Sequence, residues 1–182
     1  SSRWWQLSQV VVSSEASNMV ANADSLFLVV GDKCLRLDAA TGETTATYEM
    51  PPSNAKDTKK RTWGYLACVG DTLFGSRSAA PRTAECLFAL DLATGSVRWS
   101  HNGKSIPHSS ISIGDGQVMF IEMAATPEQR QAVLKEKIAQ AEKLVGAERL
   151  QAEKDLKAAA VRQVVALDAA TGKAVWAKAM DL

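Results

Sequence analysis

The residues of this chain whose types and spacing could do chemistry are few, and they include the two histidines, His101 and His108. His108 is followed by Ser109 and Ser110, and a histidine beside a serine is part of the arrangement that activates a nucleophile. The sequence offers no third group to orient that histidine, so a structural or surface role is favoured. Neither histidine has a second metal-ligating residue at helix or strand spacing, whereas a zinc site needs three or four ligands. We therefore predict no catalytic residue and no metal site.

Three aspartates recur in one motif, Asp-x-x-Thr-Gly, and could be taken for paired acids or calcium ligands. Their regular place before Thr-Gly favours a turn instead. The aspartate side chain can accept hydrogen bonds from backbone N–H groups two or three residues on, and the glycine supplies the positive φ that a tight hairpin needs. Each motif is therefore predicted to join two strands. The motif residues are Asp38 and Gly42, Asp91 and Gly95, and Asp168 and Gly172.

A tryptophan follows the motif glycine by four residues in the last two copies, as Trp99 and Trp176, and Ala46 takes that place in the first copy. The outgoing strand thus carries a large flat side chain where a neighbouring sheet can pack on it. We expect both tryptophans to be mostly buried, each wedged between its own sheet and the next.

Each motif is preceded by two further short apolar runs, so each repeat has the pattern of four short strands joined by turns. That is the composition of one β-propeller blade. The predicted fold class is all-β, a partial β-propeller of about three four-stranded blades plus one extra strand, with an α-helical hairpin insertion. The blades are expected at about residues 13–50, 61–103 and 105–180, and residues 3–12 as the last strand of a preceding blade.

Closed propellers have about four to eight blades. We therefore expect further blades of a longer chain, additional copies or a partner to complete the ring, and the interpretation as a segment of a longer chain is favoured. The motif aspartates are 53 and 77 residues apart, more than the roughly 40–45 residues of one blade, so both intervals contain insertions.

The larger insertion begins at Thr126-Pro127-Glu128, a helix start signal. Apolar residues then recur at helical spacing, first Leu134, Ile138, Ala141 and Val145, and later Ala152, Leu156 and Ala159. One continuous helix of about 33 residues would be about 50 Å long, yet its ends must join adjacent strands about 4.8 Å apart. Residues 126–160 are therefore predicted to form an antiparallel helical hairpin that turns near residues 144–147. It serves either as an exposed arm for protein contact or as an insertion without a partner.

The totals describe an ordinary globular chain of 182 residues with a formal net charge of +1. Nothing in that charge suggests nucleic acid or a membrane surface as partner, and no apolar run approaches the roughly 20 residues of a membrane span. Cys34, Cys68 and Cys86 lie in apolar runs, which favours buried free thiols, although a disulfide between two of them stays open. Residues 51–61 and 76–83 are predicted to be polar loops.

The string Ala-Leu-Asp-(Ala/Leu)-Ala-Thr-Gly-x-x-x-Trp, which surrounds Asp91 and Asp168, resembles the tryptophan-docking repeat of the quinoprotein (PQQ-like) β-propellers. More narrowly, residues 17–19, 31–38, 63–66 and 103–108 are similar to PQQ-binding-like repeat regions of large planctomycete-type proteins. The resemblance covers nearly the whole chain apart from about residues 125–160. That superfamily holds quinone-dependent alcohol dehydrogenases and many non-catalytic propellers, and an extracytoplasmic, for example periplasmic, location is what the resemblance implies.

Two functions follow from the resemblance. The first is a non-catalytic module for protein binding or scaffolding, without a cofactor. The second is part of a PQQ-dependent dehydrogenase or multidomain enzyme, with PQQ and calcium in the propeller channel. Catalytic members of the family share a vicinal Cys-Cys pair and acidic and amide calcium ligands, and this sequence has no adjacent cysteines and no matching ligand set. The non-catalytic function is therefore favoured.

The innermost strand of each blade lines the channel of a propeller, where ligands are commonly held. Those strands are expected to begin near Asn18, Trp63 and Ser109. Asn18, Trp63, His108 and Ser109 are accordingly the candidate ligand-binding residues, although each also has a structural explanation.

Overall fold

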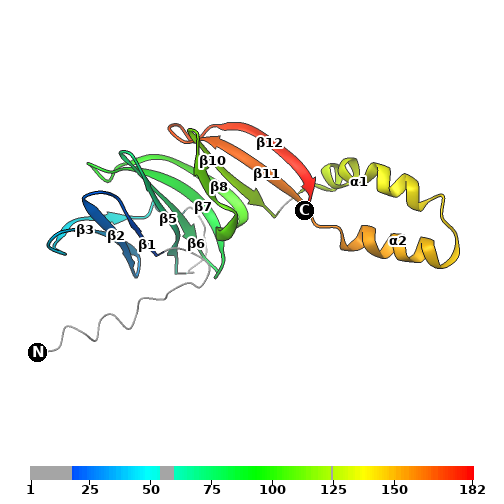
Figure 1. Cartoon of the computed structure of the whole chain (residues 1–182), viewed down its shortest axis with the longest axis horizontal. Helices are drawn as coiled ribbons and strands as arrows, with labels where there is room; N and C mark the ends of the chain where they lie inside the picture. Colours follow the sequence, from blue (N-terminus) through cyan, green and yellow to red (C-terminus); the bar gives the residue numbers. More distant parts are fainter. Residues whose placement is uncertain (1–17, 54–59, 124) are drawn as a thin grey trace, which may run out of the picture.

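The computed structural model describes residues 18–53, 60–123 and 125–182 of the chain. The described residues form three four-stranded antiparallel sheets, in each of which consecutive strands are neighbours. Figure 1 shows the sheets side by side along one arc, in chain order. The architecture is a partial β-propeller with a helical insertion, as the repeats predict. The strand expected at residues 3–12 lies outside the described residues.

The three sheets are called first, middle and third, in chain order. The first contains β1 (Met19–Ala21), β2 (Ser25–Val30), β3 (Lys33–Asp38) and β4 (Thr44–Glu49). The middle contains β5 (Thr62–Val69), β6 (Thr72–Ser78), β7 (Thr83–Asp91) and β8 (Val97–Pro107). The third contains β9 (Ser112–Gly114), β10 (Gln117–Glu122), β11 (Val161–Asp168) and β12 (Ala174–Asp181), and the short 3₁₀ helix η2 (His108–Ser110) connects the middle sheet to it. The middle sheet thus extends past residue 103, where its blade was expected to end.

The motif turns join the third and fourth strands of each sheet. In the first turn, Asp38 Oδ1 accepts hydrogen bonds from the backbone N–H of Ala40 (3.0 Å) and of Thr41 (2.8 Å) and from the Thr41 hydroxyl (3.0 Å). Gly42 donates its N–H to the Asp38 carbonyl (2.8 Å) at φ +72°, a conformation that favours glycine. The turns at Asp91 and Asp168 repeat the bonds from the threonine. The aspartates therefore stabilise their own turns, and Asp91 in addition pairs with Arg98 through its second carboxylate oxygen (2.7 Å).

Two apolar cores lie between neighbouring sheets. The first consists of Phe27, Val29, Cys34 and Tyr48 from the first sheet with Trp63, Leu66, Leu73, Cys86, Phe88 and Leu90 from the middle sheet. The second consists of Phe74, Ala84, Leu87, Ala89, Trp99 and Ile106 from the middle sheet with Ile111, Val118, Phe120, Val165 and Leu167 from the following segment. The middle sheet is thus covered on both faces, and every residue of β6 is buried.

Beside each core, an aromatic side chain of one sheet donates a hydrogen bond to the motif turn of the next sheet, and we call this contact a joint. Trp99, 7% exposed, donates its indole N–H to the carbonyl of Ala169, the residue after the motif aspartate of the third sheet (2.8 Å). Tyr48 does the same from the first sheet, because its hydroxyl donates to the carbonyl of Leu92, the residue after Asp91 (2.8 Å). The joint is thus made in the first repeat by Tyr48, two positions beyond Ala46.

Trp176 differs from Trp99 although it holds the same motif position. The expectation that it would be buried is wrong, because its side chain is 42% exposed. The reason is positional: in the described residues no sheet lies beyond β12 to cover it.

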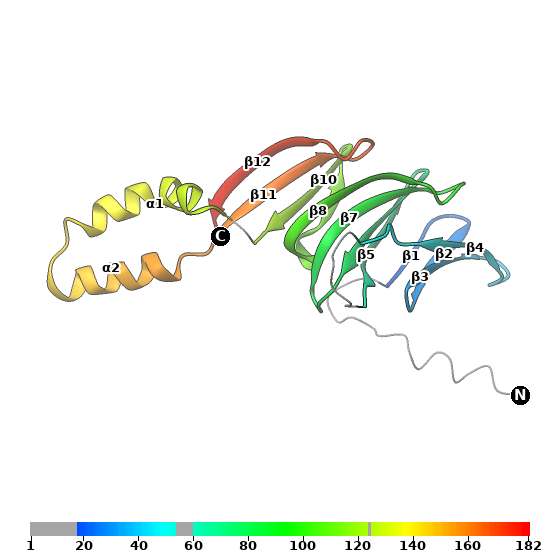
Figure 2. The same ribbon diagram turned by 180° about the vertical axis from the view of Figure 1, so that it is seen from behind.

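The helical hairpin leaves the third sheet between β10 and β11 and extends beyond it (Figures 1 and 2). It consists of α1 (Pro127–Ala141) and α2 (Gly146–Ala158). Thr126 begins α1 with a capping box, in which Gln129 N–H donates to the Thr126 hydroxyl and Thr126 N–H to the Gln129 side chain. Val145 lies in the loop between the helices, within the turn predicted near residues 144–147, and it is 80% exposed, so it does not belong to the apolar stripe. In the described part of the chain, neither helix is long and apolar enough to cross a membrane.

Candidate functional site

His108 lies buried at the start of η2. Its Nε2 is 2.8 Å from the Ser78 hydroxyl oxygen, and the ring packs so closely on Gly64 that a Cβ there would overlap it. The pair therefore joins the end of β6 to the segment after β8. Ser109, the next residue, is exposed.

Trp63 is engaged between two sheets. Its indole N–H donates to the carbonyl of Asp32 in the first sheet (3.0 Å), and its ring meets Phe88 edge-on at 5.0 Å. Asn18 precedes β1 and is half-buried. The structure thus brings His108 against the residue next to Trp63, but it uses both aromatic rings in packing. The four-residue ligand site stays a prediction.

Among the described residues, no group of three or more His, Cys, Asp or Glu side chains is placed to hold a metal ion. Cys34, Cys68 and Cys86 are free thiols on β3, β5 and β7. Burial raises the pKa of the Cys34 thiol to about 12, so it stays protonated at neutral pH.

A charged cluster that the sequence did not reveal lies beside the first core. Arg77, 5% exposed, donates to Glu85 (3.0 Å) and to the carbonyls of Pro51 and Pro52 (both 2.7 Å). Arg61 donates to the same carboxylate (3.0 Å). Residues 76–83 were predicted to be a polar loop, but Ser76, Arg77 and Ser78 continue β6, because these pairings make polar side chains tolerable in a buried strand.

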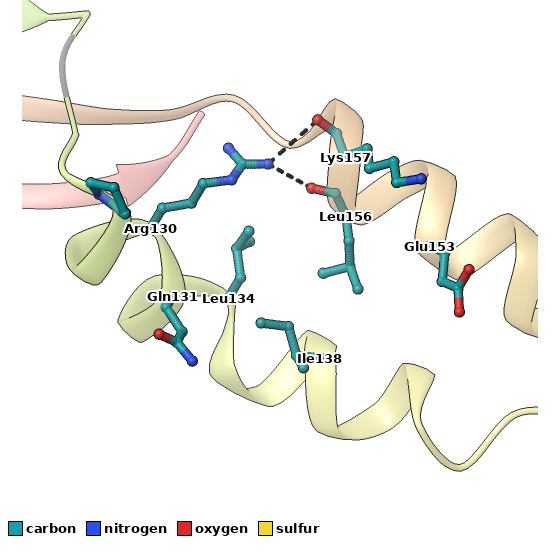
Figure 3. A pocket seen from close by; sticks show the side chains of 8 residues that line it. Arg130, Gln131, Leu134, Ile138, Glu153, Leu156 and Lys157 are labelled. Carbon is teal, nitrogen blue, oxygen red and sulfur yellow. Dashed lines mark hydrogen bonds between the residues drawn. The ribbon is translucent and has the colours of Figure 1, made fainter.

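A pocket lies between the two helices of the hairpin, and we call it the hairpin groove. Its volume is about 450 Å³. Figure 3 shows Leu134 and Ile138 from α1 and Leu156 from α2 directed into the space between the helices. The groove is lined by Pro127, Arg130, Gln131, Leu134, Ile138, Glu153, Leu156 and Lys157.

Arg130 holds one end of the hairpin groove together. It lies on α1, and its guanidinium donates to the carbonyl of Leu156 (2.6 Å; Figure 3) and to that of Ala159 at the end of α2 (2.7 Å). A cation at a helix C-terminus also meets the negative end of the helix dipole. The apolar row was visible in the sequence as helical spacing, whereas this bond was not, because its acceptors are backbone carbonyls 26 and 29 residues away.

A second contact fixes α1 to the third sheet. Lys137 Nζ lies 2.6 Å from the Asp181 carboxylate at the end of β12. In contrast, α2 has no buried residue along its described length. The hairpin is therefore attached through α1, and α2 presents its surface to solvent.

The fold and the groove together define a class of protein, a partial β-propeller that carries a projecting helical arm. No protein-family model and no curated protein matches the chain. Among solved structures, it is similar to a quinohemoprotein alcohol dehydrogenase from Comamonas testosteroni, with TM-score 0.51 and 15% identity over 89% of this chain. It is also similar to the computationally designed Ika8 protein, with TM-score 0.50 and 8% identity over 87% of this chain. The chain spans 27% and 35% of those two structures, and at these identities the likeness concerns the fold alone.

Proposed function

We propose that this chain is a non-catalytic propeller segment that binds a partner protein, with the helical hairpin as its contact arm. The observation that carries the proposal is the hairpin groove, an apolar seam between α1 and α2 on an element that projects beyond the third sheet. Insertions that survive on a repeat scaffold commonly project from one face and serve binding.

The proposed occupant of the groove is an amphipathic helix of the partner. Leu134 and Ile138 are four residues apart on α1, and Leu156 faces them from α2, so the seam follows the helix axes. A third helix matches such a seam with apolar residues at i, i+3, i+4 and i+7. Arg130, Lys157 and Glu153 at its rim are of mixed sign, which suits a partner helix with mixed charges on its flanks.

The test compares two substitutions on α2. Leu156→Glu places a charge in the groove, and Leu150→Glu places one at a position that is 62% exposed and outside the groove lining. Both variants and the unchanged chain are used to capture proteins, each captured protein is purified, and its affinity is measured by calorimetry. We expect a partner that binds the unchanged chain and Leu150→Glu equally and Leu156→Glu at least tenfold more weakly, through a segment that becomes helical on binding.

An unchanged affinity of every captured protein for Leu156→Glu would contradict the proposal. A partner whose binding segment stays extended when bound would also contradict the proposal, because the groove would then not hold a helix.

The alternative function, part of a quinone-dependent dehydrogenase, rests on the family resemblance. The residues present do not fit the vicinal pair of that family, since Cys34, Cys68 and Cys86 come from three different strands. The absorbance of a bound quinone in the purified chain, with calcium-dependent dye reduction, would overturn the non-catalytic proposal.

A further inference from the structure

The two helices that form the hairpin groove gain little stability from each other. Leu134 is buried between them, whereas Ile138 and Leu156 are only half-buried. α2 has 13 residues, and none along its described length is buried. A helix of that length is marginally stable in water unless an apolar face packs against another element. A further helix bound in the groove would therefore also stabilise α2.

The charged side chains that line the groove on α2 are opposite in sign and one helical turn apart. Glu153 and Lys157 are four residues apart, so they lie on the same face of α2, about 6 Å from each other along its axis (Figure 3). Glu153 accepts a hydrogen bond from Arg149 through Oε1 (3.0 Å). In the part of the chain that the structure describes, no carboxylate pairs with the Lys157 ammonium. The charge pattern of the groove thus matches a helix in which the same two charges follow in the reverse order.

A second α2 that runs antiparallel presents this reverse order. When a two-fold axis passes midway between Glu153 and Lys157, the Lys157 of each copy lies opposite the Glu153 of the other. The contact then contains two equivalent ion pairs. Two copies of α2 that ran parallel at the same level would place like charges opposite each other. Antiparallel, two-fold pairing is also the symmetry that identical chains adopt most often.

We infer that the helix bound in the hairpin groove is α2 of a second copy of this chain, so that two hairpins pack groove to groove as a four-helix bundle. The inference rests on the proposed function, because it names the partner helix of the same groove. The second copy is the occupant because its groove supplies both the reversed charges and the apolar side chains. Ile138 and Leu156 of both copies become buried in the bundle, as apolar rows on facing helices do in such bundles.

The first measurement is the mass of the chain in solution by sedimentation over a range of concentrations. We expect a reversible dimer with twice the 19.5 kDa of one copy. Leu156→Glu places a charge in both grooves and should weaken the dimer at least tenfold. Ala147→Glu is its control, because Ala147 is exposed and lies about two and a half turns from Leu156, on the opposite side of α2.

The second measurement tests the charge pattern. Glu153→Lys leaves two positive charges opposite two others, and Lys157→Glu does the same with negative charges. Each change should weaken the dimer about tenfold at low salt, since both ion pairs become repulsive. Arg149→Gln is the control for Glu153→Lys, because both changes break the pair between Arg149 and Glu153 within α2. It should leave the dimer unchanged.

Mixing the Glu153→Lys chain with the Lys157→Glu chain gives the sharpest test. One chain is then positive at both positions and the other negative at both, so the mixed dimer should be tighter than the dimer of either variant alone. The double variant Glu153→Lys with Lys157→Glu should also recover the dimer, because both partners of each pair change sign. Circular dichroism of all variants establishes that they are folded.

The outcomes separate this inference from the proposed function. A chain that is monomeric throughout, while a captured protein binds Leu156→Glu more weakly, would overturn the second copy as occupant and retain the groove as a binding site. A dimer insensitive to Leu156→Glu would count against the groove itself. A dimer insensitive to the charge changes, or a mixture without recovery, would overturn the antiparallel pairing and with it the inference.

Discussion

At the scale of single residues, Tyr48 and Trp99 hold neighbouring sheets together, each through a buried ring and one hydrogen bond. Trp99→Ala should lower the free energy of unfolding by about 3–5 kcal/mol, the range for deleting a core aromatic. Tyr48→Phe removes the hydroxyl alone and should cost about 1 kcal/mol. Val97→Ala, on the exposed side of β8, is the control and should change little. Urea denaturation measures all three, and equal losses for Trp99→Ala and Val97→Ala would contradict the joint.

Arg77 is the charged residue on which we expect the largest effect. Arg77→Leu leaves two proline carbonyls and part of the Glu85 carboxylate without their donor, and should cost about 3 kcal/mol. Lys33→Ala breaks an exposed pair with Glu49 (3.6 Å) and should cost less than about 1 kcal/mol. The difference between the two denaturation midpoints checks the prediction, and similar midpoints would show that Arg77 is not structurally important.

The same cluster gives a pH dependence. Hydrogen bonds from Arg61, and then from Arg77, hold the pKa of the Glu85 carboxyl below its ordinary value, against the opposing effect of burial. A carboxyl whose pKa is lowered by folding stabilises the protein above its unfolded pKa of about 4.3, and this contribution is lost as pH falls through the folded pKa. Glu85→Gln should therefore flatten the acid side of the stability profile. A Glu85→Gln profile as steep as that of the unchanged chain would refute the assignment.

The roles of some of these residues can be predicted from the sequence, and the roles of others cannot. The motif turns are local, since donor and acceptor lie within four residues, so their geometry follows from the motif. Tyr48 was missed because its joint depends on which residue of the strand face reaches a distant carbonyl, and residues two apart share a face. Trp176 was wrongly expected to be buried. The burial of a side chain depends on whether another sheet packs beside its own, and a local sequence motif does not carry that information.

At the scale of elements, the hairpin is expected to be dispensable for the sheets. Replacing residues 126–160 by Gly-Asp-Gly leaves β10 and β11 to be joined by a short turn, since they pair from Glu122 and Gln163 onward. We expect loss of the helical circular dichroism signal, a single cooperative transition and a melting temperature within about 5 °C of the original. Loss of cooperativity would show that α1 supports the third sheet.

The existence of the elements was more predictable than their limits. The helical hairpin could be predicted from the short distance between adjacent strands, because one straight helix cannot return to the neighbouring strand. The turn was predicted near residues 144–147 and lies between Ala141 and Gly146, while Val145 had also been counted in the apolar stripe, because a periodic pattern does not mark where a helix ends. The extent of β6 could not be predicted because its polar residues are paired with Glu85 on the next strand and with Pro51 and His108, which are 26 and 30 residues from their partners.

At the scale of the whole molecule, each sheet packs only against the sheets next to it. The first, middle and third sheets should therefore differ in local stability. The middle sheet is covered on both faces, so its amides in β6 and β7 should exchange with solvent most slowly, and those of β1 and β12 faster. Hydrogen exchange followed by mass spectrometry checks this order. Exchange in β12 as slow as in β6 would contradict it.

The joint at the motif turn has a consequence for curvature. In each turn the threonine and the glycine donate hydrogen bonds to the aspartate, and at the turns of Asp91 and Asp168 the carbonyl of the next residue accepts a hydrogen bond from an aromatic donor of the preceding sheet. The angle between neighbouring sheets is therefore set by this hydrogen bond beside the outermost strand. The apolar side chains of each core then only have to fill the space between the two sheets. The curvature of a repeat array is the sum of the angles between its successive units. Core residues can therefore differ from one pair of sheets to the next while the radius of the arc stays constant.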